Sequence, residues 1–200
     1  MNLAGRIHFH RACLLPSPWV LSVENGFSNI NTLESFTLRR IACAPNPTLK
    51  RAAVRTALKE ELHWEGGRPI RWRESEKGPE VLEPLERGPV SVSISYAPRE
   101  AWLALGWEGH IGVDAVATEA VADWEEVASL YLEPTAQERL RKSVRPELDF
   151  AREWAGFEAR LKLGGLSLHE GVIPPPALLF EASFATVSVA VALNLRSKSP

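Results

Sequence analysis

The strongest constraint on the fold of this chain is a long amphipathic helix that we expect over residues 147–163. Its large apolar side chains recur at helical spacing, and they are Phe150, Trp154, Phe157 and Leu161. Pro146 precedes the helix as a first-turn residue, and the pair of glycines beginning at Gly164 ends it. A continuous stripe of this kind is typical of a helix that packs against a protein core, with Glu158 and Lys162 at the edge of the stripe.

A strictly alternating run over residues 90–95 predicts a strand with two different faces. Valine and isoleucine occupy one face, and the other carries Ser91, Ser93 and Ser95. Two further apolar runs, 102–107 and 110–117, complete a predicted three-stranded meander. Three small hydroxyls in a row leave room for a ligand or for a closely packed helix, and the sequence favours neither.

The remaining elements follow from turn and capping signals. Asn46 and Pro47 predict the start of a helix over 48–63, and Arg51, Arg55 and Lys59 form a basic stripe on it. Such a stripe is either a binding surface or simply a solvated face. Further helices are expected over 124–131 and 135–143, with one or two closing strands over 184–195. Residues 1–45 indicate only short strands and turns.

Composition excludes several classes of function. The chain has 200 residues, of which 45% are hydrophobic, enough for one compact unit. With 23 basic and 25 acidic residues the net charge is -2, so we expect no binding to nucleic acid or to an anionic membrane. No apolar stretch reaches the roughly 18 residues of a membrane span. Two cysteines without paired spacing, Cys13 and Cys43, fit a reducing compartment, so we expect a cytoplasmic protein.

Two carboxylates are the candidate metal ligands. Asp114 follows an apolar strand, and Glu158 projects from the long helix, so both would be held on rigid elements. Oxygen donors of this type are what magnesium prefers, and magnesium neutralises the charge that develops on a phosphate leaving group. The alternatives are a strand-end cap for Asp114 and an ion pair between Glu158 and Lys162, four residues apart.

Three motifs occur in a fixed order: Ser-Ile-Ser-Tyr at 93–96, Ile-Gly-Val-Asp at 111–114 and Trp-Ala-Gly-Phe-Glu-Ala-Arg-Leu-Lys at 154–162. Their order and spacing resemble the 4'-phosphopantetheinyl transferase superfamily. The resemblance covers residues 90–165, and 46–89 more loosely. It implies an α/β fold of two pseudo-symmetric halves, 1–108 and 109–200, each a small antiparallel sheet packed on a long helix. It also implies a monomer with coenzyme A in the cleft between the halves.

The resemblance implies a reaction and the residues that perform it. The 4'-phosphopantetheine group of coenzyme A would pass to a serine of an acyl or peptidyl carrier protein, releasing 3',5'-ADP. Asp114 and Glu158 would hold magnesium, and Glu158 would take the proton of the carrier serine. Lys162 would pair with the phosphates and stabilise the charge of the leaving group.

The same resemblance implies a binding site for coenzyme A, which is the substrate here. Ser95 and Tyr96 match the Ser-His pair that binds phosphate in the family. Arg51 and Arg55 correspond to basic residues that reach the 3'-phosphate, and Lys77 to the lysine of a Gly-Lys-Pro segment, out of register. Carrier proteins are acidic, so a basic group on a predicted helix is either a docking surface or a solvated face; it consists of Arg139, Arg141, Lys142 and Arg145.

The chain departs from the family pattern near the predicted site. Tyr96 replaces a histidine, Val116 stands where many members have an acid, and Phe157 replaces a lysine. These changes leave two alternatives open beside an active transferase. The chain could be a degenerate relative that binds coenzyme A or a carrier protein without catalysis, or an unrelated soluble domain. Retention of Asp114 and Glu158 together with Lys162 favours the active enzyme.

Overall fold

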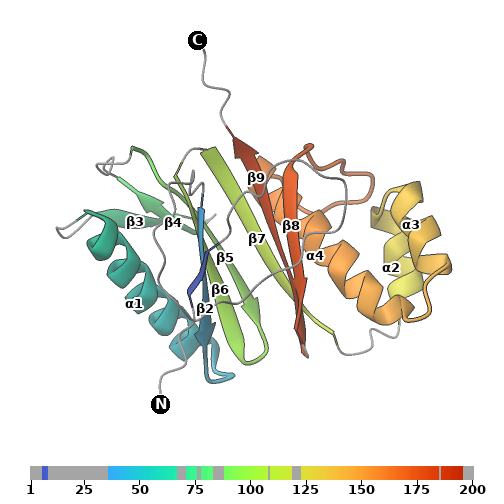
Figure 1. Ribbon diagram of the computed structural model, residues 1–200, viewed down its shortest axis with the longest axis horizontal. Coiled ribbons are helices and arrows are strands. Elements are labelled where there is room, and N and C mark those ends of the chain that lie inside the picture. The colour runs from blue at the N-terminus through green and yellow to red at the C-terminus, as the bar shows by residue number, and fades with distance from the viewer. Residues whose placement is uncertain are drawn as a thin grey trace, which may run out of the picture.

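The computed structural model contains three antiparallel sheets and four helices in the part of the chain that it describes (Figure 1). The described residues are 6–8, 36–66, 71–75, 78–82, 88–107, 109–118, 123–184 and 186–195. The mixed α/β class predicted from the sequence is therefore confirmed. Among these residues, no helix combines the length and the apolar character that crossing a membrane requires.

The first sheet has the strand order β1-β2-β6-β5. Its members are β1 (Arg6–His8), β2 (Phe36–Ala42), β5 (Ser91–Ala97) and β6 (Glu100–Gly106). Between β2 and β5 the chain forms helix α1 (Pro47–Gly66) and a two-stranded sheet of β3 (Trp72–Ser75) and β4 (Gly78–Val81).

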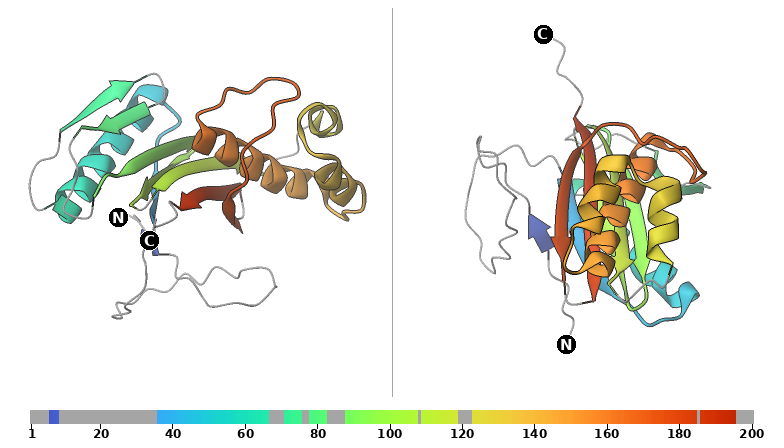
Figure 2. Two further views of the ribbon diagram at one scale, coloured as in Figure 1. Left: turned by 90° about the horizontal axis from the view of Figure 1, so that it is seen from above. Right: turned by 90° about the vertical axis from the view of Figure 1, so that its right-hand side faces the viewer.

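The second sheet has the order β7-β9-β8. It consists of β7 (Gly109–Ala117), β8 (Leu178–Ser183) and β9 (Val187–Leu195). Between β7 and β8 lie the helices α2 (Trp124–Tyr131), α3 (Pro134–Arg141) and α4 (Pro146–Gly164). The two sheets thus share one connection pattern, in which a first strand is followed by a long helix, an edge strand and a central strand. Both long helices lie on the same side of the sheets (Figure 2).

The ends of the two long helices follow the sequence signals. Asn46 caps α1, because its Oδ1 accepts hydrogen bonds from the amides of Thr48 and Leu49 at 2.9 and 3.1 Å. Helix α4 begins at Pro146 and ends at Gly164, and the capping residue Gly165 has a left-handed φ of 62°. The Gly165 amide closes the helix by donating to the carbonyl oxygen of Lys162. Both predicted helices are confirmed.

The predicted meander of three strands is wrong at its third member. Strands β5 and β6 form a hairpin, but β7 pairs with β9 and contacts β5 through side chains. Serine hydroxyls of β5 accept hydrogen bonds from main-chain amides of β7. The pairs are Ser91–Ile111 (3.3 Å), Ser93–Val113 (3.0 Å) and Ser95–Ala115 (3.1 Å). The serine face therefore packs on strand β7 rather than on a helix, and Ser91 and Ser93 also line a cleft. Its hydroxyls take the place of strand carbonyls and join the two sheets, and we call this contact the serine ladder.

The closing strands confirm one prediction and extend it. Of the one or two strands expected over 184–195, one is present there, β9, and a further strand, β8, precedes it at 178–183. Strand β2 was not distinguished within residues 1–45, because its alternation is interrupted by Arg39 and Arg40. Arg39 pairs with Glu60 and Glu61 of α1, which lets a basic residue occupy a strand beside the core.

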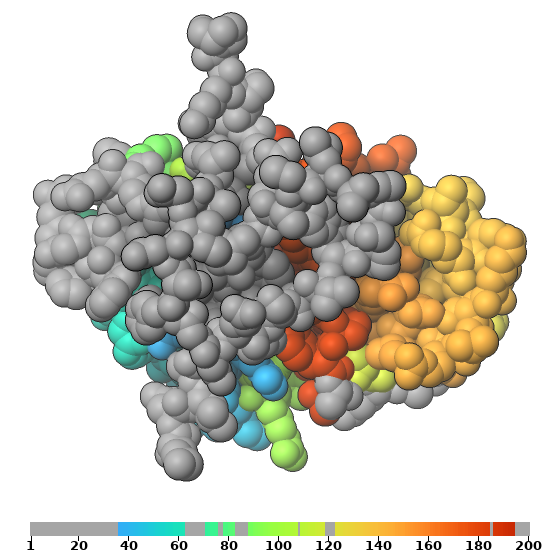
Figure 3. Space-filling view, viewed as in Figure 1, coloured from blue at the N-terminus to red at the C-terminus, as the bar shows by residue number. Residues whose placement is uncertain are grey.

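Helix α4 buries two different faces. The predicted aromatic stripe is confirmed: Phe150 and Phe157 pack with Leu140 in a cluster between α4 and the helices α2 and α3. These helices form one end of the molecule (Figure 3). The other face carries Ala155 and Ala159, which pack on alanines of β9. Phe157 is 1% exposed, so in this position an apolar side chain serves the core.

Candidate functional site

Asp114 is a carboxylate buried in the middle of the molecule. It lies on β7 opposite Ala190 of β9, and it is 3% exposed. Its strand neighbours Val113 and Ala115 face the opposite side of the sheet, in the main apolar cluster. Because burying a charge without partners is costly, the surroundings of Asp114 must compensate it.

Gly112 brings helix α4 directly onto the strand that carries Asp114. A Cβ atom at Gly112 would lie 2.0 Å from the Ala159 carbonyl oxygen and 2.7 Å from the Leu163 amide nitrogen. Only glycine allows the two backbones to approach so closely. Asp114 follows two residues later on the same strand face, while Glu158 and Lys162 directly precede Ala159 and Leu163. The close contact therefore places Glu158 and Lys162 beside Asp114.

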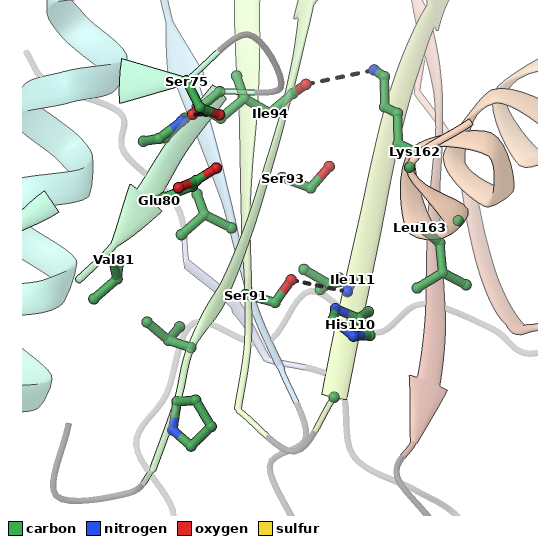
Figure 4. Close-up of a pocket in the computed structure, with 18 of the residues that line it drawn as sticks. Ser75, Glu80, Val81, Ser91, Ser93, Ile94, His110, Ile111, Lys162 and Leu163 are labelled. Atoms are coloured by element: carbon green, nitrogen blue, oxygen red, sulfur yellow. Dashed lines mark hydrogen bonds between the residues drawn. The ribbon is translucent and has the colours of Figure 1, made fainter. Parts of the chain in front are cut away.

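Two side chains hold the Asp114 carboxylate through one oxygen. The Lys162 ammonium lies 2.6 Å from Asp114 Oδ1, and the Ser95 hydroxyl donates to the same atom at 2.8 Å. Lys162 also donates to the carbonyl oxygens of Val113 at 3.1 Å and, more weakly, of Ile94 at 3.5 Å. Figure 4 shows Lys162 reaching across from α4 toward Ile94 on β5. Asp114 therefore forms an ion pair with Lys162, and it lies inside β7, so the alternative of a strand-end cap is wrong.

Glu158 is the second carboxylate of the site. Burial and the adjacent Asp114 carboxylate raise its pKa from the usual 4.5 to about 7. The nearby Lys162 acts in the opposite direction, since a cation favours the ionised form. Two carboxylates in electrostatic contact thus share one ammonium group, and the repulsion between them is the feature that an added cation would relieve.

The donor atoms of this site suit a hard divalent cation. In the part of the chain described here, no group of three or more His, Cys, Asp or Glu side chains is arranged to hold a metal ion. Magnesium, however, is commonly bound by one or two carboxylates together with substrate phosphates and water. Asp114 and Glu158 provide such a pair, so the residues present fit magnesium.

Two cavities meet at this point. A smaller one of about 450 Å³ lies over Asp114 and Glu158 and is bordered by Trp154 and Val116. A larger cleft of about 1610 Å³ extends between α1 and the end of α4, beyond the roughly 300–1,000 Å³ of ordinary small-molecule pockets. The residues that line both cavities are Ile94, Tyr96 and Lys162.

The wall of the large cleft on the side of α1 carries Arg51 and Arg55. Arg55 forms a two-pronged ion pair with Glu74 of β3, and its guanidinium lies 5.6 Å from the ring of Trp72. Burial lowers the pKa of Arg55, but Glu74 and the adjacent Tyr96 outweigh it and raise the pKa overall. Its Nη1 is buried without a hydrogen-bond partner among the described residues. Such an unsatisfied donor is suited to an anionic ligand.

The structure brings most of the predicted site residues to one cleft. Ser95 is buried against Asp114, whereas Tyr96 is 41% exposed and lines both cavities. Lys77 lies outside the described residues. Three members of the basic group in and after α3 form ion pairs: Arg139 pairs with Glu153, and both Arg141 and Lys142 pair with Glu138. These ion pairs favour the solvated face over a free docking surface.

Two contributors to the site were not recognised in the sequence. Glu74 anchors Arg55, and its only signal is its position in a short strand after Trp72. Gly112 was read as one letter of a motif, but its role is to admit helix α4. The signal for that role was present in Ala155 and Ala159, small residues one turn apart on the same helix.

Comparisons with known proteins add no identification. No protein-family model matches this chain, and no curated protein matches it either.

Proposed function

We propose that this chain is a magnesium-dependent 4'-phosphopantetheinyl transferase with the two-half fold of that family. The observation that carries the proposal is the meeting of Asp114, Glu158 and Lys162 where two cavities join. These residues come from separate motifs, on β7 and α4, and sequence proximity does not explain why they meet. The repeated connection pattern of the two sheets supports the halves 1–108 and 109–200.

Coenzyme A would occupy the large cleft. Its anionic groups would meet Arg51 and Arg55 on α1, where the unsatisfied Nη1 of Arg55 can donate to a phosphate oxygen. Tyr96, adjacent to Arg55, would orient the same group through its hydroxyl. Lys162 lines the cleft as well and supplies the positive charge closest to the buried carboxylates. The carrier serine would approach through the smaller cavity over Glu158.

The reaction forms one bond and breaks one bond at the β-phosphorus of coenzyme A. Glu158 accepts the proton of the carrier serine, whose oxygen bonds to phosphorus. The bond from phosphorus to the oxygen of 3',5'-ADP breaks, and Lys162 stabilises the charge on that leaving group. Asp114 and Glu158 would hold magnesium, which when bound supplies charge neutralisation at the pyrophosphate. Ser95 keeps Asp114 in place by its hydrogen bond.

A decisive experiment mixes the purified protein with an apo carrier protein, coenzyme A and magnesium, and weighs the carrier by mass spectrometry. We expect the carrier to gain one phosphopantetheine group, with no gain after chelation of magnesium. Asp114→Asn and Glu158→Gln should remove nearly all transfer, because loss of metal-centred stabilisation costs several kcal/mol of barrier. The matched controls Asp123→Asn and Glu147→Gln change exposed acids near the helices and should retain activity. Full activity of either site variant would refute the assignment.

A second candidate function is binding of coenzyme A or a carrier protein without catalysis. The observation that favours it is Phe157, which occupies the family's lysine position and is fully committed to the core. A cation is therefore missing from that position beside Glu158. Calorimetric binding of coenzyme A without any modification of several carrier proteins would favour this alternative over the enzyme.

A further inference from the structure

The Lys162 ammonium lies in an environment built from oxygen acceptors. Three of them surround it: the Asp114 carboxylate and the main-chain carbonyls of Val113 and Ile94. Carboxylate and carbonyl oxygens are also the ligands of hard metal ions. The position of the ammonium group is therefore chemically equivalent to that of a bound cation, and it lies between the two sheets (Figure 4).

A divalent cation bound through Asp114 Oδ1 would compete with this ammonium group for the same atom. Asp114 is held through Oδ1, which already accepts from Ser95 and Lys162. Two cations at one buried carboxylate repel each other strongly, since the protein interior screens charge weakly. A metal ion that binds Oδ1 without a phosphate ligand therefore displaces Lys162, and the displaced ammonium needs a new anionic partner.

The large cleft offers room for that partner. Lys162 lines both cavities, and its side chain is 37% exposed, so a rotation of its flexible stem can carry the ammonium from Asp114 into the large cleft. A ligand with phosphate groups in the cleft would receive it there. Metal binding would then release the Lys162 ammonium to pair with the phosphates. Phosphate binding would in turn release the Asp114 carboxylate to bind the metal.

We propose that Lys162 occupies the cation position of the ligand-free site and leaves it when a divalent cation and a phosphate ligand bind together. This inference rests on the proposed function, since it takes magnesium and coenzyme A as the two ligands. It makes Lys162 the link between them. Either ligand alone has to break the ion pair of Lys162 with Asp114 and leaves one of these charges without a partner. When both ligands bind, each charge gains a new partner, so their binding is positively coupled.

The test measures binding of Mn²⁺, a paramagnetic substitute for Mg²⁺, by the electron paramagnetic resonance signal of the free ion. Titrations are made with and without coenzyme A, and coenzyme A without protein corrects for direct chelation. In the parent protein we expect coenzyme A to tighten Mn²⁺ binding by a factor of roughly 5 to 150, the usual range of such coupling. In Lys162→Met, Mn²⁺ alone should bind more tightly than in the parent, and coenzyme A should add little.

A matched control and a second variant keep the test decisive. Lys142→Met removes an exposed lysine that pairs with Glu138, and it should bind Mn²⁺ as the parent does. Lys162→Gln keeps a hydrogen-bond donor for Asp114 without the charge, and it guards against loss of folding in Lys162→Met. Circular dichroism establishes that each variant is folded, and whichever of the two Lys162 variants folds gives the result.

The possible outcomes separate this inference from the proposed function. If the parent binds Mn²⁺ with coenzyme A but the folded Lys162 variants bind Mn²⁺ alone no more tightly than the parent, Lys162 does not hold the cation position. The inference is then wrong while the transferase assignment stands. If neither the parent nor the folded Lys162 variants bind Mn²⁺ under any condition, both the inference and the transferase assignment are overturned. Tighter binding to the Lys162 variants with reduced coupling supports the exchange.

Discussion

The two long helices occupy equivalent places in the two sheets but pack in opposite ways. Helix α1 contacts its sheet through large side chains, and the residues of this contact are Val54, Leu58, Leu62, Leu103, Leu105 and Trp107. Helix α4 contacts its sheet through alanines, and at Gly112 the strand presents no side chain at all. The thickness of side chains between two elements sets how closely their backbones approach.

This difference explains where the chemistry lies. On α4 the close approach brings Glu158 and Lys162 to a buried strand carboxylate, Asp114. On α1 the bulky contact leaves the basic residues Arg51 and Arg55 facing an open cleft. One helix therefore supplies a tight group of charges and the other a wall for a large ligand. Small residues at a helix-sheet contact can thus be a functional requirement as well as a packing choice.

The largest effect is expected when the close contact of α4 is opened. Gly112→Ala introduces a Cβ that overlaps main-chain atoms of Ala159 and Leu163, and backbone cannot rotate away as a side chain can. We expect the free energy of unfolding to fall by about 3 kcal/mol or more. Urea unfolding followed by tryptophan fluorescence measures the change.

The control for this substitution lies in the other sheet. Gly106→Ala would place its Cβ 3.1 Å from the Ile111 Cβ and 3.2 Å from the Gly109 carbonyl oxygen. Shifts of a few tenths of an ångström relieve contacts of this length, so its cost should be clearly smaller. Equal stability of the parent and Gly112→Ala would show that the backbone contact with α4 is not tight.

Replacing Glu158 of α4 or Glu61 of α1 by glutamine should change the stability of the protein in opposite directions. Glu158 has a folded-state pKa of about 7 against the usual 4.5, so the folded protein retains a proton that the unfolded chain loses. Stability therefore falls as pH rises through that window, and Glu158→Gln should restore about 1 to 3 kcal/mol at pH 8 and nothing near pH 4. Glu61 of α1 is 1% exposed and pairs with Arg39, so Glu61→Gln should cost about 1 to 3 kcal/mol.

Thermal unfolding at several pH values tests this contrast. A stabilising Glu158→Gln beside a destabilising Glu61→Gln would show that the site on α4 is kept at a cost in stability, as is common for functional groups. Loss of stability in Glu158→Gln at pH 8 would contradict the repulsion between Glu158 and Asp114.

Replacing the serines of the serine ladder by alanine should lower the stability of the protein by an amount that depends on the position. Ser93→Ala and Ser95→Ala each leave a buried amide of β7 without an acceptor, and each should cost about 1 to 3 kcal/mol. The Ser91 bond is longer at 3.3 Å and only half-buried, so Ser91→Ala should cost less than about 1 kcal/mol. Chemical denaturation ranks the three variants, and a larger effect at Ser91 than at Ser93 would contradict this account.

The smallest effect is expected at the exposed edge of the cleft. Tyr96→Phe removes one hydroxyl beside Arg55, and it should weaken coenzyme A binding by about 0.5 to 1.5 kcal/mol. Tyr131→Phe is the matched control, because Tyr131 packs on Trp154 away from the large cleft. Isothermal titration calorimetry without a carrier protein measures both. Unchanged binding in Tyr96→Phe would assign Tyr96 to packing alone.

Local signals in the sequence were sufficient to predict where the long helices begin and end, but insufficient to predict how the strands pair. Asn46, Pro146 and Gly165 act on their own backbone neighbours, so the ends of α1 and α4 could be predicted. Strand pairing depends on residues far apart in the chain, and the meander prediction failed there because β7 turns to β9. The serines of β5 are visible in the sequence, but their partner is not.

The sequence by itself determined the mixed α/β class, the long helices and the presence of Asp114, Glu158 and Lys162 in separate motifs. Only the tertiary structure decided that these three groups meet at one position and that Lys162 pairs with Asp114. The physical reason is that burial and electrostatic contact depend on distances between elements. Those distances are set here by Gly112 and the alanines of α4, whose small size has meaning only once helix and strand are in contact.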